Sequence, residues 1–293
     1  MKRDIASGSA GSPREEERTA LEAGLYVVAT PIGNLGDITA RALDVLARAD
    51  MIAAEDTRNT RAMLRHFGIA TRLIALHEHN ERRSAAEVVR WISEGSAVAL
   101  VSDAGTPAVS DPGAHLVAAV REQGHRVFPV PGPSALTAAL SASGISHDGV
   151  VFAGFLPVKG AERRAKLAAL AAGPWAIALF EAPHRIAATL GDLHEALGDR
   201  DIVIAREITK KFETITRIRL AEAKSWVEAD DDRRRGEFVL VIEGRPPPAQ
   251  GTDPRDVLAA LLAELPLKQA VALAAKITGA RRNELYRMAL DMK

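Results

Sequence analysis

The chain has 293 residues, about twice the usual length of one domain, so its length predicts two domains and a smaller third part. Apolar residues make up 47% and charged residues 26%, ordinary values for a globular protein with a sizeable core. Lys plus Arg and Asp plus Glu both number 38, which argues against a polycationic nucleic-acid binder but leaves room for a local basic patch. The absence of cysteine excludes disulfide frameworks, thiolate metal sites and cysteine nucleophiles.

The first 23 residues are polar and contain no hydrophobic run. We therefore expect residues 1–23 to form a disordered tail rather than a secretory signal. No later window approaches the roughly 18 consecutive apolar residues that a membrane span needs. These observations predict a cytoplasmic protein that does not act at a membrane.

Five short apolar runs follow, and amphipathic segments separate them. The runs are 25–30, 51–56, 73–78, 97–103 and 126–131. They are rich in β-branched residues, as is typical of strands buried on both faces of a parallel sheet. Helices are expected at 38–49, with Asp37 as N-cap, and at 83–95, with Gly95 at the C-terminal end. This alternation predicts a parallel α/β domain over residues 24–148.

The pattern restarts near residue 150. Further strands are predicted at 150–157, 174–183, 201–209 and 237–244, and helices at 162–173 and 184–198. Segment 211–220 alternates polar with apolar residues, which indicates an antiparallel strand. We therefore expect a second α/β domain with a mixed sheet over 149–245. A Pro/Gly-rich linker at 246–254 then leads to a helical appendage at 255–293.

Functional residues of open α/β sheets lie in loops beyond the strand ends, and four such loops have unusual compositions. Loop 30–37 is rich in glycine but matches neither the dinucleotide-binding fingerprint nor the P-loop. A plain strand-to-helix turn would also account for its glycines. Loop 130–140 contains Ser134 as a helix cap after a Pro-Gly-Pro turn, and loop 179–186 carries Glu181, His184 and Arg185.

Loop 102–113 is longer than a simple connection requires, and it carries Asp103, Thr106 and Asp111 but no Lys or Arg. The lack of cations makes a polyphosphate a poor ligand, whereas a neutral or zwitterionic ligand with amine and hydroxyl groups fits. A purely structural loop and a divalent metal site are the alternatives. We expect no metal, because no third ligand lies at a fixed spacing from the two aspartates.

Several of these segments together resemble a known family. The motifs TPIGNLGD, AEDTRNTRAML, VSDAGTPAVSDPG, VPGPSA, FEAPHR and REITKKFET occur in this order. They resemble the tetrapyrrole-methylase-fold superfamily and, within it, the ribosomal small subunit methyltransferase I branch. The resemblance spans residues 25–290 and implies S-adenosylmethionine bound between two α/β domains. It also implies methylation of a cytidine ribose 2′-oxygen in 16S rRNA at the decoding centre, and a homodimer.

The resemblance places the cofactor on positions in the loops described above. The matching positions are Pro31, Ile32, Gly105, Thr106, Pro107, Val109, Ser134 and Ala135, with Phe180 and Ala205 matching less closely. This agrees with the loop composition, because S-adenosylmethionine carries an amine, a carboxylate and hydroxyls but no phosphate.

Methyl transfer to a ribose hydroxyl requires alignment and removal of the hydroxyl proton. Asp56 and Glu181 are the candidate bases. Arg58, Arg185 and Lys210 are candidate cations for the forming alkoxide, although Arg58 and Lys210 could equally hold RNA phosphate.

The appendage resembles a helix-turn-helix around Gly279. Between Lys268 and Arg287 it carries one acidic residue, Glu284, and five basic residues: Lys268, Lys276, Arg281, Arg282 and Arg287. A solvated helical face would explain them, but we prefer a surface that binds phosphate of small-subunit rRNA, either free or within the assembled subunit. Two other functions remain as alternatives: a precorrin-type tetrapyrrole methyltransferase of the same fold, and a non-enzymatic RNA-binding module.

Overall fold

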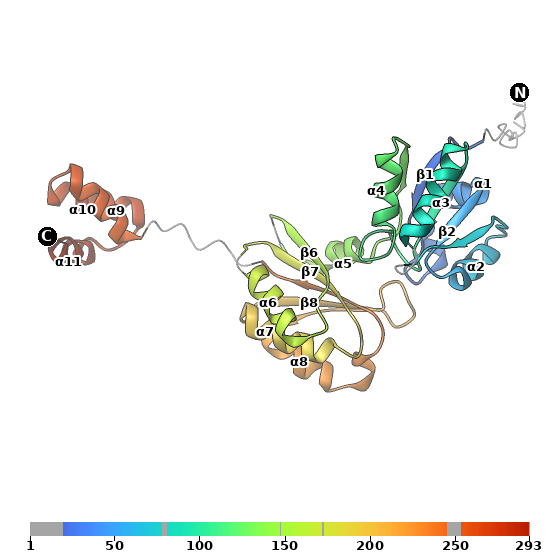
Figure 1. Cartoon of the computed structure of the whole chain (residues 1–293). Helices are drawn as coiled ribbons and strands as arrows, with labels where there is room; N and C mark the ends of the chain where they lie inside the picture. The colour runs from blue at the N-terminus through green and yellow to red at the C-terminus, as the bar shows by residue number, and fades with distance from the viewer. Residues whose placement is uncertain (1–19, 78–80, 147, 172, 245–252, 293) are drawn as a thin grey trace, which may run out of the picture.

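The computed structural model describes residues 20–77, 81–146, 148–171, 173–244 and 253–292. They form two five-stranded sheets with flanking helices, followed by a bundle of three helices (Figure 1). The predicted tail, apart from its last residues, and most of the predicted linker lie outside the described residues. None of the helices described is long and apolar enough to cross a membrane.

The first sheet has the strand order β3-β2-β4-β1-β5, and all neighbouring strands are parallel. Its strands are β1 (Gly24–Val28), β2 (Met51–Ala54), β3 (Leu73–Ala75), β4 (Ala97–Val101) and β5 (Val127–Val130). Each predicted run overlaps one of these strands, which confirms the parallel sheet. The strands themselves are largely apolar because helices cover both faces of the sheet.

Two pairs of helices cover this first sheet. Helices α1 (Ala40–Arg48) and α2 (Thr57–His66) pack on one face, whereas α3 (Glu81–Ser93) and α4 (Ala114–Glu122) pack on the other. The carboxyl ends of the strands stay uncovered, and the loops beyond them are free to form a site.

The start of α1 differs from the prediction. Thr39, not Asp37, is the N-cap, and its hydroxyl accepts a hydrogen bond from the Ala42 amide at 3.0 Å. Asp37 instead ends a short 3-10 helix, Leu35–Asp37, because the Asn34 side chain caps that turn first. Gly95 follows α3 with φ of 98°, the left-handed region in which glycine commonly ends a helix.

The second sheet has the order β6-β7-β10-β8-β9. Its strands are β6 (Val150–Phe155), β7 (Ala176–Glu181), β8 (Asp201–Arg206), β9 (Thr214–Arg219) and β10 (Phe238–Ile242). Strands β6 and β7 are parallel and the other neighbours are antiparallel, so the prediction of a mixed sheet is confirmed. Helices α6 (Gly160–Ala171), α7 (Ile186–Leu197) and α8 (Leu220–Glu228) pack on one face, and α8 is followed by the short 3-10 helix Asp231–Arg234.

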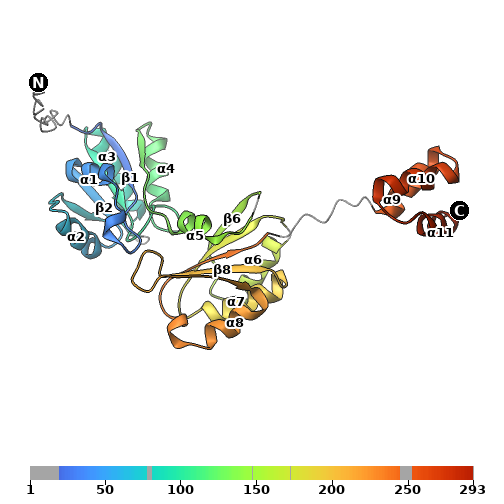
Figure 2. The same cartoon turned by 180° about the vertical axis from the view of Figure 1, so that it is seen from behind.

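The other face of the second sheet is covered by α5 (Ala135–Ser143), which precedes this sheet in the chain. Ala139 of α5 is fully buried in one cluster with Val203 of β8 and Val239 of β10. Figures 1 and 2 both show α5 between the two sheets. The predicted domain boundary at 148/149 therefore falls after a helix that packs on the second domain.

Helices α9 (Pro254–Glu264), α10 (Leu267–Thr278) and α11 (Arg282–Asp291) form the C-terminal bundle. Their apolar residues pack in a core of their own, in which Leu258, Ala270 and Leu285 are fully buried. Gly279, with φ of 70°, ends α10 and allows the turn into α11. The predicted helical appendage is confirmed.

Candidate active site

A cavity of about 390 Å³ lies where the loops of the first sheet meet the second sheet, a volume within the usual range for small-molecule sites. Its residues follow β1, β2, β4 and β5 of the first sheet, or come from β6, β7, β10 and the loop after β8 of the second. The lining consists of Ile32, Glu55, Asp103, Ala104, Gly105, Thr106, Val109, Asp111, Ser134, Ala135, Phe155, Phe180, Glu181, Ala182, Pro183, Ile208, Lys210, Glu237, Phe238 and Val239.

Gly105 leaves bare backbone on the cavity wall. Its amide and carbonyl exchange hydrogen bonds with Thr30 at 3.0 and 2.9 Å, which ties loop 102–113 to the end of β1. Gly105 has φ of 82°, and a Cβ atom there would lie 3.4 Å from Cγ2 of Ile32. Ala108 and Ser110 also have positive φ, a conformation that costs energy in residues other than glycine and often marks functional loops.

Three carboxylates of the first domain border the cavity: Glu55, Asp103 and Asp111. Burial raises the pKa of Asp111 to about 6, helped by the nearby charges of Glu55 and Asp103 and opposed by a hydrogen bond with Ser102. Burial also raises the pKa of Glu55. A carboxylate with this raised pKa accepts a proton more readily than an ordinary aspartate does.

Most of the predicted cofactor positions meet at this cavity. Seven of them line it: Ile32, Gly105, Thr106, Val109, Ser134, Ala135 and Phe180. Pro31, Pro107 and Ala205 are buried and lie outside the lining. Ser134 is the N-cap of α5, but its hydroxyl makes no capping hydrogen bond.

Glu181 borders the cavity, yet its side chain is fully buried and both of its oxygens are occupied. Oε1 accepts a hydrogen bond from the Ala182 amide at 2.8 Å and lies 3.1 Å from Nε of Arg185. Oε2 accepts a hydrogen bond from the Thr189 hydroxyl at 2.6 Å. Arg185 in turn donates to the Leu156 carbonyl at 2.6 Å, beyond the end of β6. The Glu181–Arg185 ion pair, referred to below as the Glu181–Arg185 brace, therefore links β7 and α7 to the end of β6.

Lys210 lines the cavity from the loop after β8. Its Nζ lies 2.9 Å from Oε1 of Glu207 and 2.8 Å from Oε2 of Glu237. Burial opposes its charge, but hydrogen bonds to these two carboxylates raise the pKa of Lys210 above its ordinary value. Lys210 is thus a neutralised cation at the cavity wall.

Asp56 and Arg58 lie at the start of α2, outside the cavity lining. Asp56 is the N-cap and accepts a hydrogen bond from the Arg58 amide at 2.8 Å, while the Arg58 guanidinium lies 2.7 Å from its other oxygen. The Arg58 guanidinium, with that amide, lowers the pKa of Asp56 to about 2. An acid this strong is a weak proton acceptor.

Two family models match the chain. One is described as Tetrapyrrole (Corrin/Porphyrin) Methylases and covers residues 24–224, and the other is the RsmI C-terminal HTH domain, which covers 248–293. The ribosomal RNA small subunit methyltransferase I of Escherichia coli O157:H7 is 51% identical over 92% of this chain and 95% of that protein. Its counterpart in Pseudomonas aeruginosa is 50% identical over 91% of this chain and 96% of that protein. The chain belongs to the ribosomal RNA small subunit methyltransferase I family.

Solved structures that resemble this family member share its fold. Uroporphyrin-III-C-methyltransferase from Thermus thermophilus gives a TM-score of 0.53 at 20% identity and covers 75% of this chain and 94% of its own. A cobalt precorrin-4 methyltransferase gives 0.55 at 19% identity and covers 74% of this chain and 93% of its own. These matches confirm the predicted tetrapyrrole-methylase architecture of the two sheets.

Several residues of this family member's cavity are not among the predicted site residues. Glu55 stands directly before Asp56, so the sequence marks the motif but not which of its two carboxylates enters the cavity. Strand alternation decides between them, because Glu55 extends β2 into the cavity whereas Asp56 turns away to cap α2. Phe155 comes from β6, within the segment FAGFLP that also resembles the family, and Glu237 immediately precedes β10, where no local pattern in the sequence marks a site residue.

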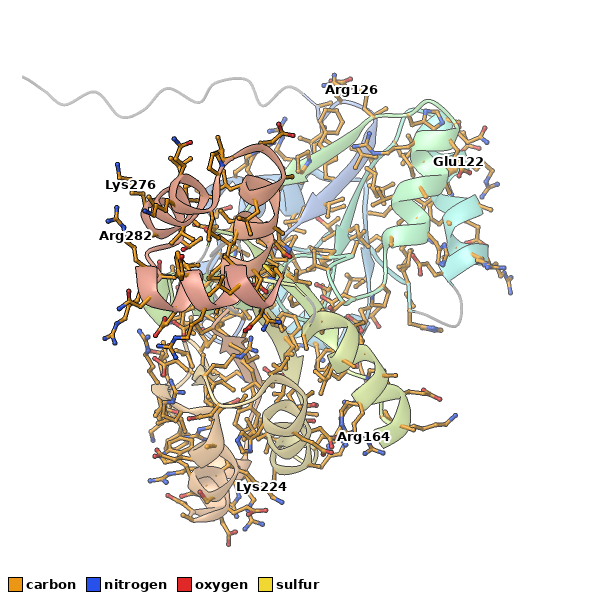
Figure 3. The ribbon with its side chains drawn as sticks, turned by 90° about the vertical axis from the view of Figure 1, so that its left-hand side faces the viewer. Glu122, Arg126, Arg164, Lys224, Lys276 and Arg282 are labelled. Atoms are coloured by element: carbon orange, nitrogen blue, oxygen red, sulfur yellow. The ribbon has the colours of Figure 1, made fainter. Side chains whose placement is uncertain are left out.

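The C-terminal bundle of this family member carries its basic residues on the surface. The side chains of Lys268, Lys276, Arg281, Arg282 and Arg287 are all exposed. Figure 3 shows Lys276 and Arg282 projecting outward on the same side of the bundle. Within the described part of the chain, no group of three or more His, Asp or Glu side chains is arranged to hold a metal ion.

Proposed function

We propose that the chain transfers a methyl group from S-adenosylmethionine to the ribose 2′-oxygen of a cytidine in small-subunit rRNA, at the decoding centre. The observation that carries this proposal is a cavity built by the family's motifs, with bare glycine backbone on one wall and carboxylates on another. The name shared by relatives about 50% identical to the chain supports ribosomal RNA of the small subunit as the substrate.

The charges that line the cavity suit S-adenosylmethionine. Among the described residues that line it, Lys210 is the one Lys or Arg, and two carboxylates neutralise it, so nothing there clamps a phosphate. Glu55, Asp103 and Asp111 suit a ligand that carries an ammonium, a sulfonium and ribose hydroxyls. Gly105 would let the ligand approach the wall closely because it has no side chain, and Ser134 would offer a hydroxyl that makes no capping hydrogen bond. When bound, the cofactor supplies the electrophilic methyl group.

Asp111 is our candidate for the acceptor of the hydroxyl proton. It lines the cavity and titrates near pH 6, whereas Asp56 is held ionised outside the cavity and Glu181 is committed to Arg185. We assign Arg185 a structural role, because its guanidinium donates a hydrogen bond to the Leu156 carbonyl beyond the end of β6. In this proposal it does not stabilise an alkoxide. We assign Arg58, with its side chain 86% exposed, to RNA phosphate.

The C-terminal bundle is proposed to hold rRNA phosphate through its exposed cations. A tetrapyrrole substrate would have no need of such a bundle. The homodimer implied by the family resemblance is part of this proposal.

The decisive experiment supplies tritiated S-adenosylmethionine with three acceptors: small ribosomal subunits, naked 16S rRNA and a precorrin. Mass analysis of digested RNA should find 2′-O-methylcytidine. Comparing small ribosomal subunits with naked 16S rRNA shows whether the substrate is the assembled subunit or the free RNA. Methylation of the precorrin alone would establish the tetrapyrrole alternative. Binding of RNA without transfer to any acceptor would establish the non-enzymatic one.

A further inference from the structure

The loop between β8 and β9, residues 207–213, is held in place by several hydrogen bonds, although its second half, residues 211–213, is exposed. Thr209 donates its amide to Glu213 at 2.6 Å, and Lys210 bridges Glu207 and Glu237. Arg206 donates to the Phe212 carbonyl at 3.2 Å and to the carbonyls of Asp232 and Arg235 at 2.9 and 3.2 Å.

The backbone of this hydrogen-bonded loop is also strained. Glu207 and Thr209 have positive φ angles of 52° and 66°. Residues other than glycine keep such a conformation only where the surrounding contacts enforce it, and such positions cluster at functional sites.

This loop presents an aromatic ring and a cation to solvent. Phe212 is 64% exposed, and Nζ of Lys211 lies 5.5 Å from its ring centroid. Lys210, one position earlier, is neutralised, whereas no hydrogen bond or ion pair is formed by Lys211 with the described residues. The loop therefore offers solvent a ring face and an ammonium group side by side, the two groups that hold a base and its phosphate in single-stranded nucleic acids.

The loop stands at the edge of the cavity. Lys210 lines the cavity and packs against loop 30–37 of the first domain, where a Cβ on Gly33 would collide with its Cγ. A second exposed ring comes from the β6 side: Phe155 lines the cavity, is 50% exposed and meets Phe180 edge-on at 5.7 Å between centroids. One exposed ring therefore lines the cavity on the β6 side, and Phe212 follows the cavity-lining Lys210 by two residues on the β8–β9 side.

We propose that Phe212 stacks on an unpaired nucleobase next to the target nucleotide while Lys211 contacts the adjoining phosphate. The proposal rests on the proposed function and narrows its substrate to an unstacked, single-stranded stretch of RNA. Base stacking on aromatic side chains is how proteins usually hold such strands, and a cation beside the ring matches the phosphate that follows each base.

The test uses the full chain and a short RNA containing an unpaired cytidine with 2-aminopurine beside it. Phe212→Ala and Phe212→Leu should weaken binding of this RNA by about 5- to 150-fold, the usual range for losing one stacked base. Phe212→Trp should restore binding and quench the fluorescent base. On the natural acceptor, KM should rise while kcat and S-adenosylmethionine affinity stay unchanged, because Phe212 touches no reacting atom.

Ile215→Ala provides the matched control, since Ile215 is an exposed apolar residue, 39% accessible, in the same hairpin. Equal RNA affinity in Phe212→Ala and the wild type would overturn the proposal, and so would a Leu variant that binds as well as the Trp variant. If Phe212→Ala instead dissociates an oligomer in sedimentation experiments, the ring belongs to an interface between copies of the chain, which also overturns it. Failure of the wild type to methylate any RNA would sink the proposed function itself, a result distinct from these.

Discussion

Gly105 combines two properties that can be separated experimentally: a left-handed backbone and a place on the cavity wall. Gly105→Val adds both strain and bulk, so S-adenosylmethionine binding should be abolished while the protein remains folded. Gly124→Val is the matched control, because Gly124 has a similar φ of 75° but open space around it. Calorimetric titration should show that S-adenosylmethionine binding disappears in Gly105→Val but not in Gly124→Val. Both variants should lose about 1–3 kcal/mol in the free energy of unfolding, the usual cost of one strained residue. Unchanged affinity at position 105 would contradict the site.

Asp111 is expected to couple activity to pH. Methyl transfer should rise as the pH passes about 6, where the Asp111 carboxyl loses its proton, and Asp111→Asn should lose roughly 10²–10⁴ in rate and this titration. Because the folded-state pKa lies above the unfolded value, the folded protein binds more protons between about pH 4 and 6. Stability of the wild type should therefore fall as pH rises through this window.

Asp111→Asn should remove that loss, raising stability at neutral pH by on the order of 1 kcal/mol after allowance for solvent screening. Thermal unfolding measured at several pH values checks this. A variant that is slower but no more stable would show that burial does not penalise the Asp111 charge.

Some of the cavity residues could be predicted from the sequence, and others could not. Gly105, Thr106 and Ser134 are predictable because their loops are too long or too rich in glycine for simple connections, and all three line the cavity. The sequence does not show that Asp56 and Asp111 differ in acidity. Both follow buried strands, and only the three-dimensional contacts show that Arg58 acidifies one while burial weakens the other.

The Glu181–Arg185 brace acts at the level of elements, since it joins β7, α7 and the end of β6. Glu181→Gln leaves the Arg185 guanidinium, 14% exposed, without its counter-charge. We expect a loss of about 3–5 kcal/mol in the free energy of unfolding, because breaking a buried pair costs far more than the pair itself contributes. Denaturant unfolding measures this. A variant with normal stability but roughly 10²–10⁴ slower transfer would instead mark Glu181 as the base.

Strands are the most predictable elements, because a strand that is buried on both faces of its sheet consists of an uninterrupted run of apolar residues. Strand β9 is recognisable by its alternation, which reflects one exposed face at the edge of a sheet. Helix positions follow from their periodicity, but periodicity does not say which sheet a helix covers. The packing of α5 on the second sheet therefore emerges only in the structure.

At the scale of the whole molecule, the bundle of α9–α11 has its own core, so removing residues 251–293 should leave both sheets folded. RNA binding should weaken, and its salt slope should fall by roughly 0.7–0.9 for each phosphate that the bundle no longer neutralises. S-adenosylmethionine affinity should stay the same, because none of the described bundle residues lines the cavity.

A matched full-length variant with Lys276, Arg281, Arg282 and Arg287 changed to Ala separates charge from shape. Filter binding across a salt series compares the three proteins. Equal slopes in all of them would leave the bundle without a role in RNA binding, and loss of cofactor binding on truncation would mark it as structural.

Helix α5 has a consequence for the width of the cavity. It follows the last strand of the first sheet in the chain, yet its apolar face packs against β8 and β10 of the second sheet. Its first turn, beginning at Ser134, forms part of the cavity wall. Because α5 is fixed to the second sheet, it moves with that half of the molecule, and its buried contacts, such as those of Ala139 and Val203, would survive a relative displacement of the two halves. Such a displacement would bend the Pro-Gly-Pro loop between β5 and α5 instead. Since Ser134, at the end of that loop, lines the cavity, bending the loop would change the width of the cavity itself.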